Sequence, residues 1–227
     1  MVSKKVAIAF TSQYGYIAEI AQEIGKILTN KGISVDIINL KKARRNYWPI
    51  IENYDGILIG SNSAIWRFMR KQSNDFLRET IPRVIEKGII TGIFMSDPRD
   101  LPTILDPDSA TVVLEKEIIK RYGFKPSMCR KFAPVIDLSR SSKIKSEAKK
   151  DLRLSAKHFS RKTGIVIDMK GYNDFRDWNR VNEFALRFAN SIDSTTLQSE
   201  NKRICPNCGK EVEPSWNNCI HCAYKLK

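Results

Sequence analysis

The chain has 227 residues, a hydrophobic fraction of 42% and four Trp, which is enough apolar content for a packed core and excludes an intrinsically disordered chain. A formal net charge of +14 favours polyanionic partners, namely nucleic acid, an anionic membrane surface or acidic small molecules. No apolar run approaches the roughly 18 residues of a membrane-spanning helix, and no signal peptide precedes the first expected strand. We therefore expect a cytoplasmic protein.

The first expected unit is a strand, a polar turn and a helix. The apolar run at 6–10 (VAIAF) is typical of a strand that is buried on both faces of a parallel sheet. A turn rich in hydroxyl groups follows at 11–16, and from Ile17 apolar residues recur at helical spacing. Such a turn presents free backbone N–H groups and the positive end of the helix, which suits a phosphate. The alternative is an ordinary strand–turn–helix unit without a ligand.

The remaining elements alternate in the same way. Further strands are expected at 33–38, 55–61, 89–95 and 129–136, and further helices at 68–86, where Pro82 would kink or split the helix, and at 110–122. Five strands that alternate with helices predict an α/β fold with a doubly wound parallel sheet. Polar turns follow the first, third and fourth strands, and these turns meet at the carboxyl edge of such a sheet, where ligands bind. This convergence favours the phosphate-loop interpretation.

A basic segment at 140–163 carries nine Lys and Arg against two acidic residues, so it holds half of the net charge of +14. An apolar stripe at helical spacing runs through it, formed by Ile144, Ala148, Leu152, Ala156 and Phe159. A basic amphipathic helix can lie on an anionic membrane or on a partner, or it can pack its stripe on the protein's own sheet and turn its basic face to water. We favour the last interpretation.

Two Cys-x-x-Cys pairs near the C-terminus predict a metal site, and their members are Cys205, Cys208, Cys219 and Cys222. Each pair directs two thiolates at one point, and two pairs complete a tetrahedron around Zn²⁺. All four ligand positions are then filled, so the site is structural. We expect a zinc ribbon at 204–227, with Ala223 where the second pair commonly has Gly, joined by a linker at 191–203 that lacks helical period.

Several stretches resemble a known family. The segments 11–17 (TSQYGYI) and 54–61 (YDGILIGS), with the short loop after the fourth strand, resemble flavodoxins. Within that superfamily, the basic insert before the last helix and the segment 177–185 (DWNRVNEFA) are most similar to the flavodoxin-like, quinone-dependent protoporphyrinogen oxidases. The resemblance implies a flavodoxin-like domain at 1–190, with a doubly wound five-stranded parallel sheet in the order 2-1-3-4-5.

The resemblance also implies bound FMN. By position, the loop around the phosphate is formed by Thr11, Ser12, Gln13, Tyr14, Gly15, Tyr16 and Ile17. The residues that flank the isoalloxazine ring are Ser61, Asn62, Ser63 and Trp66, with Ser96 near its far edge. Ile17 stands where the family has a threonine whose hydroxyl binds the phosphate, and Tyr14 replaces a smaller residue. Losing one hydrogen bond to a charged group lowers affinity by about ten- to a hundredfold.

The function that the resemblance implies is that of an FMN-dependent oxidoreductase, a protoporphyrinogen IX dehydrogenase of haem biosynthesis that passes electrons to a quinone or similar acceptor. Arg67, Arg70 and Lys71 are candidates to meet an acidic substrate such as a tetrapyrrole, and the segment 140–163 would touch the inner face of the membrane. One alternative is an electron carrier of the flavodoxin type, without a substrate of its own, that docks redox proteins. Another is a non-redox module that has lost FMN and binds nucleic acid or protein. No catalytic residue is assigned.

Overall fold

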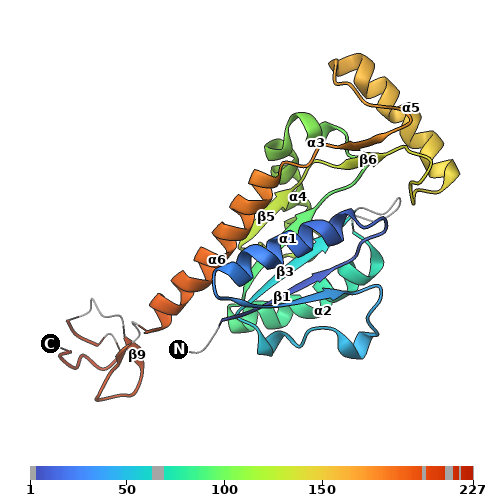
Figure 1. Cartoon of the computed structure of the whole chain (residues 1–227). Coiled ribbons are helices and arrows are strands. Elements are labelled where there is room, and N and C mark those ends of the chain that lie inside the picture. Colours follow the sequence, from blue (N-terminus) through green and yellow to red (C-terminus); the bar gives the residue numbers. More distant parts are fainter. Residues whose placement is uncertain (1–3, 63–68, 201–202, 213–216, 220, 227) are drawn as a thin grey trace.

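A central sheet of five parallel strands organises the computed structural model, which describes residues 4–62, 69–200, 203–212, 217–219 and 221–226 (Figure 1). The strands lie in the order β2-β1-β3-β4-β5. Their bounds are Ser34–Asn39 for β2, Lys5–Phe10 for β1, Gly56–Ser61 for β3, Ile90–Met95 for β4 and Met128–Lys131 for β5. This is the flavodoxin-like order, so the predicted fold class is confirmed.

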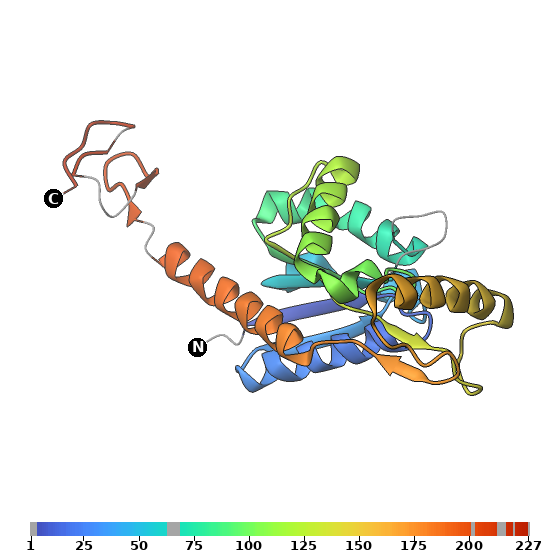
Figure 2. The same cartoon turned by 90° about the horizontal axis from the view of Figure 1, so that it is seen from above.

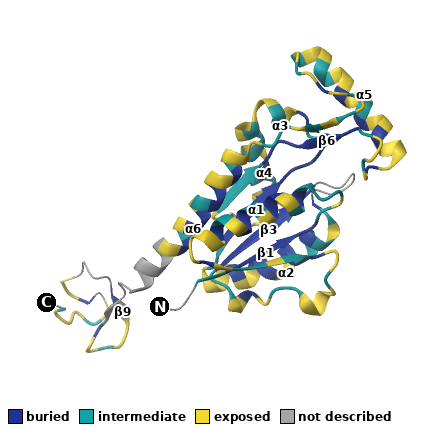
Figure 3. Ribbon diagram, in the orientation of Figure 1, coloured by how far each residue is buried: buried dark blue, intermediate teal, exposed yellow. Residues whose placement is uncertain are grey.

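Helices cover both faces of the sheet (Figure 2). On one face α1 (Tyr16–Asn30) and α6 (Trp178–Glu200) pack on alternate strand residues such as Ile8 and Leu58. On the other face α2 (Lys71–Lys87) and α4 (Pro107–Tyr122) pack on Ala7, Ile57 and Ile93. Successive strand side chains point to opposite faces of the sheet. Because helices cover both faces, both sets of strand residues are fully buried, and the central strands are dark blue in Figure 3. The short helix α3 (Pro102–Leu105) follows β4.

One helix and one strand differ from the sequence expectation. Pro82 does not split α2, which runs without interruption from Lys71 to Lys87. The strand expected at 129–136 is divided: β5 ends at Lys131, and β6 (Val135–Asp137) pairs antiparallel with β7 (Tyr172–Asp174) in a separate sheet. Pro134 lies between β5 and β6 and has no N–H to donate to a strand ladder. The β6–β7 pair, whose strands are separated in the chain by residues 138–171, therefore lies outside the central sheet.

The basic segment forms α5 (Ser146–Thr163), which lies beyond the carboxyl edge of the sheet (Figure 1). Leu152 and Ala156 are buried in an apolar cluster with Ile136 of β6 and Leu138, which follows it. The helix therefore packs its own stripe, as favoured above, but against the β6–β7 pair and not on the five-stranded sheet. The stripe also differs at one position, since Ala148 is exposed and Lys149 is buried in its place. The Lys149 ammonium donates to the Ser139 carbonyl at 2.7 Å.

The linker expected at 191–203 is helical over most of its length, because α6 continues to Glu200. Extending a helix that is already packed costs far less than nucleating one, so a polar segment without apolar period can still be helical. Past it, β8 (Arg203–Ile204) and β9 (Glu211–Val212) form a hairpin within the cysteine-rich module at the end of the chain. The division into domains at 190 and 204 stays a prediction. In the part of the chain that the structure describes, no helix has the length and apolar character required to cross a membrane.

Candidate functional site

Thr11 and Ser61 lie beneath the loop that joins β1 to α1. The Thr11 hydroxyl is buried, 2.8 Å from Ser73 Oγ and 3.3 Å from Ser61 Oγ. Ser73 Oγ in turn donates to the Gly60 carbonyl at 3.1 Å. These hydroxyls tie β1, β3 and the first turn of α2 together. Sequence reasoning missed Ser73, for which the only signal is its place in the helix that follows β3.

The loop itself ends at Gly15, which precedes α1 in a left-handed conformation with φ of 108° that favours glycine. Its N–H donates to Ser12 Oγ at 3.1 Å. In the first turn of α1, the N–H groups of Tyr16, Ile17 and Ala18 have no helix carbonyl to which they can donate. Together with the positive end of the helix, these groups form the kind of donor set that binds phosphate.

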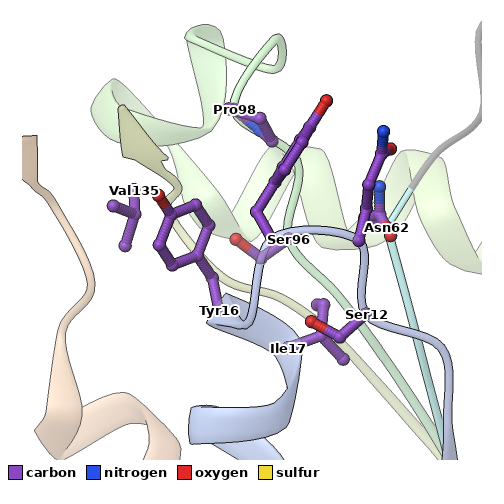
Figure 4. A pocket seen from close by; sticks show the side chains of 9 residues that line it. Ser12, Tyr16, Ile17, Asn62, Ser96, Pro98 and Val135 are labelled. Carbon is purple, nitrogen blue, oxygen red and sulfur yellow. The ribbon is translucent and has the colours of Figure 1, made fainter. Parts of the chain in front are cut away.

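One small cavity brings the ends of three strands together (Figure 4). It is lined by Ser12, Gln13, Tyr14, Tyr16 and Ile17 of the first loop, Asn62 after β3, Ser96 and Pro98 after β4, and Val135 of β6. Seven of the twelve residues predicted from sequence thus line this cavity. Thr11, Gly15 and Ser61 do not line it but lie next to lining residues in the chain. Ser63 and Trp66 lie outside the described residues. Pro98 and Val135 were not predicted.

The donors around this cavity fit a phosphate, whereas its volume does not admit a flavin ring. The cavity measures about 10 Å³, room for about one water molecule. Ile17 is 2% exposed and packs in the apolar core with Ile20 and Phe184, so it supplies no polar group. Backbone N–H groups and the Ser12 hydroxyl would therefore hold the phosphate, and a flavin ring would enter only after side chains of the cavity wall have moved.

The two loop tyrosines contact each other and the region of the β6–β7 pair. The Tyr16 hydroxyl donates to Asp137 Oδ2 at 3.3 Å, and its ring lies edge-on to that of Tyr172, with 6.3 Å between centroids. Burial and the neighbouring Asp137 carboxylate raise the pKa of Tyr16, so the phenol stays protonated. Figure 4 shows the Tyr16 ring turned toward Val135. Tyr16 thus joins the first loop to both strands of the β6–β7 pair.

Two arginines lie near the outer end of the site. The Arg99 guanidinium binds the buried Asp97 carboxylate through Nε and Nη2, both at 3.0 Å. The backbone N–H of Arg70 donates to Ser61 Oγ at 3.1 Å, and partial burial lowers the pKa of its side chain. Lys71, a candidate for an acidic substrate, forms an ion pair with Asp75. Arg67 lies outside the described residues.

The four cysteines of the C-terminal module converge on one point. The Cys205–Cys222 and Cys208–Cys219 sulfur pairs are each 3.6 Å apart, and all four sulfurs lie within 4.8 Å of one another. Zinc with Zn–S bonds of about 2.3 Å in a tetrahedron places its sulfurs about 3.8 Å apart, so the cluster fits Zn²⁺. It would be a closed structural site.

The two cysteine turns repeat one backbone pattern. Gly209 N–H donates to the Cys205 carbonyl at 2.9 Å, and Ala223 N–H donates to the Cys219 carbonyl at 2.8 Å. Both Gly209 and Ala223 are left-handed, with φ of 66° and 58°. Ala223 is the one residue other than glycine with positive φ in the chain as described. Ala223 stands where the second pair commonly has Gly, and its left-handed backbone is therefore locally strained.

No protein-family model and no curated protein matches this chain. Among solved structures it resembles the Flv1 flavodiiron core of Synechocystis sp. PCC6803, with 16% identity and a TM-score of 0.47 over 85% of this chain. The chain spans only 37% of that flavodiiron protein. It also resembles flavodoxin 1 of Bacillus cereus, with 19% identity and a TM-score of 0.39 over 70% of this chain and 98% of the flavodoxin.

A flavodoxin of Streptococcus pneumoniae TIGR4 is similar at 16% identity and a TM-score of 0.41, over 70% of this chain and 99% of the flavodoxin. The fold is flavodoxin-like. That assignment depends on the strand order and the parallel register of the five strands, because similarities of this size concern the fold alone.

Proposed function

We propose that this protein is an FMN-dependent oxidoreductase of the flavodoxin type. The observation that carries the proposal is the convergence of the 11–17 loop with the polar ends of β3 and β4 around one cavity. This cavity lies at the carboxyl edge of a sheet of order 2-1-3-4-5, beside β1 and β3, where strand order reverses. Flavodoxin-like sheets bind FMN at that switch point.

The protein's part in such a site is to bind, orient and exclude water, while FMN when bound supplies the electron transfer. The N–H groups of Tyr16 and Ile17 would donate to the phosphate. The Ser12 hydroxyl accepts a hydrogen bond from Gly15, so its own proton is available to a phosphate oxygen. Asn62 and Ser96 line the cavity from the ends of two adjacent strands and would orient the ring edge.

Within this class, we propose oxidation of protoporphyrinogen IX in haem biosynthesis, with a quinone or similar acceptor. Support comes from the sequence similarity at 177–185 and from the inserted segment that forms α5. A cytoplasmic protein of this kind would meet its acceptor at the inner face of the membrane, through the basic face that α5 turns to water. Four cysteines in the ribbon would bind structural Zn²⁺.

Two observations favour an alternative function. The cavity of about 10 Å³ and the buried Ile17 favour a non-redox module that has lost FMN. Its basic segment and ribbon would then contact nucleic acid or protein. A carrier of the flavodoxin type, without a substrate of its own, is the remaining redox alternative.

The visible spectrum of the purified full chain, before and after incubation with FMN, tests the class. Flavin absorbance that stays with the protein through gel filtration is the expected result, and a colourless protein would refute both redox proposals. Anaerobic assay of protoporphyrinogen oxidation with a quinone then separates enzyme from carrier. Turnover supports the dehydrogenase, whereas a protein that binds FMN and only cycles electrons with redox partners is a carrier.

A further inference from the structure

A second hollow lies on the other side of the loop that follows β4. Its volume is about 520 Å³, within the range of roughly 300–1,000 Å³ that is usual for small-molecule sites. One wall consists of Arg99, Leu101 and Pro102, and the other is the face of α5 formed by Leu154, Ser155, His158, Phe159 and Lys162. We call this hollow the α5 groove.

The α5 groove combines an apolar floor with cations. Leu101 is buried and Phe159 is half-buried in the cluster beneath α5, while Leu154 keeps 70% of its surface exposed at the rim. Lys162 has no carboxylate partner among the residues that the structure describes. Arg99 is held in one orientation by its two bonds to Asp97. Such a surface suits a molecule that is apolar in its body and acidic at one end.

The groove is a neighbour of the candidate flavin site. Pro98 lines the cavity, and the next residue, Arg99, lines the groove, so the two hollows share the loop after β4 as a wall. Tyr14, which lines the cavity, also packs in the apolar cluster that contains Leu101. A molecule seated in the groove would therefore contact the same loop that borders the candidate flavin site.

We propose that the α5 groove is the substrate-binding site, and that it takes an amphipathic anion whose acid group binds Lys162 and Arg99 and whose apolar body covers Leu101, Leu154 and Phe159. Its role as a substrate site depends on the proposed FMN site, but the binding itself needs no flavin. This separation allows the two proposals to fail independently.

The test uses the full chain and the fluorescent probe 8-anilinonaphthalene-1-sulfonate, an aromatic body with one acid group. Dissociation constants are compared for the natural protein, Lys162→Gln, Leu154→Ser and the control Lys157→Gln, which removes an exposed lysine of α5 outside the groove. We expect Lys162→Gln to weaken binding by about tenfold, through loss of a charged hydrogen bond. Leu154→Ser should weaken it by about threefold or more, and the control should stay within about twofold.

Equal affinities for Lys162→Gln and Lys157→Gln, or no saturable binding of the probe, would overturn the proposal. All three positions are exposed, so the thermal midpoint of each variant should match that of the natural protein. FMN titration of the same variants gives the second readout. Probe binding without FMN binding refutes the redox function and leaves the groove in place, whereas FMN binding without probe binding refutes the groove alone.

Discussion

Replacing Ile17 by threonine should tighten FMN binding while it destabilises the unliganded protein. Ile17 is at the N-terminal turn of α1, where its N–H faces the loop, and its side chain lines the cavity while 98% of its surface is removed from water. A threonine hydroxyl at this position would add one hydrogen bond to the phosphate. A bond to a charged group contributes about 1.5–3 kcal/mol, so we expect affinity to rise about ten- to a hundredfold.

The cost in stability follows from the same burial. Ile17→Thr removes about two buried carbons, at about 0.8 kcal/mol each, and introduces a hydroxyl in their place. We therefore expect the free energy of unfolding without FMN to fall by about 2 kcal/mol. Binding restores stability, since FMN at about 100 times its dissociation constant adds about 2.7 kcal/mol.

The assays are a fluorescence titration with FMN and urea unfolding with and without FMN. Ile20→Thr is the matched control, because Ile20 is fully buried on the same helix and does not line the cavity. It should show a similar loss of stability and no gain in affinity. If Ile17→Thr binds FMN no more tightly than the natural protein, the 11–17 loop does not hold the phosphate and the reasoning is refuted.

Three further predictions concern zinc affinity, packing of the sheet and the pH dependence of stability. Ala223→Gly relieves a left-handed alanine, so zinc affinity measured by competition with a chelator should rise about fivefold, from about 1 kcal/mol of relieved strain; unchanged affinity would contradict this. Gly60→Ala places a Cβ 2.4 Å from the Phe94 ring. It should cost about 1–3 kcal/mol in urea unfolding, and a loss below about 0.5 kcal/mol would contradict the close approach. The ion pair with Lys5 lowers the pKa of Asp36, so its contribution is complete at neutral pH and disappears as pH falls below about 4. Urea midpoints between pH 7 and 3 should therefore fall less steeply for Asp36→Asn, and equal slopes would count against the pair.

Much of the candidate site could be read from the sequence because its parts are local. A strand, a polar turn and a helix in immediate succession fix the direction of the backbone N–H groups at 16–18. The alternation of five strands with helices then predicts that the turns after β1, β3 and β4 share one edge. The cysteine turns are likewise local, since two residues between ligands suffice to form each pair.

Contacts between distant segments could not be predicted in this way. Burial of the Thr11 hydroxyl against Ser73 joins residues that are 62 positions apart, and the Tyr16–Asp137 hydrogen bond spans 121 positions. Neither pair has a periodicity or a spacing that a sequence reveals. Burial of Lys149 in place of Ala148 on α5 could not be predicted for the same reason. The Ser139 carbonyl that accepts the hydrogen bond from the Lys149 ammonium belongs to another segment.

By itself the sequence determined the fold class, and it predicted the polar loop at 11–17 and the convergence of the four cysteines, since each depends on hydrophobic period or short spacing. Only the tertiary structure decided that the fifth expected strand divides, that the β6–β7 pair and α5 lie beyond the carboxyl edge of the sheet, and that a groove forms there. The physical reason is that this region is stabilised by burial of an apolar cluster drawn from segments between residues 14 and 175. Burial depends on where those segments meet in space, which no local pattern specifies.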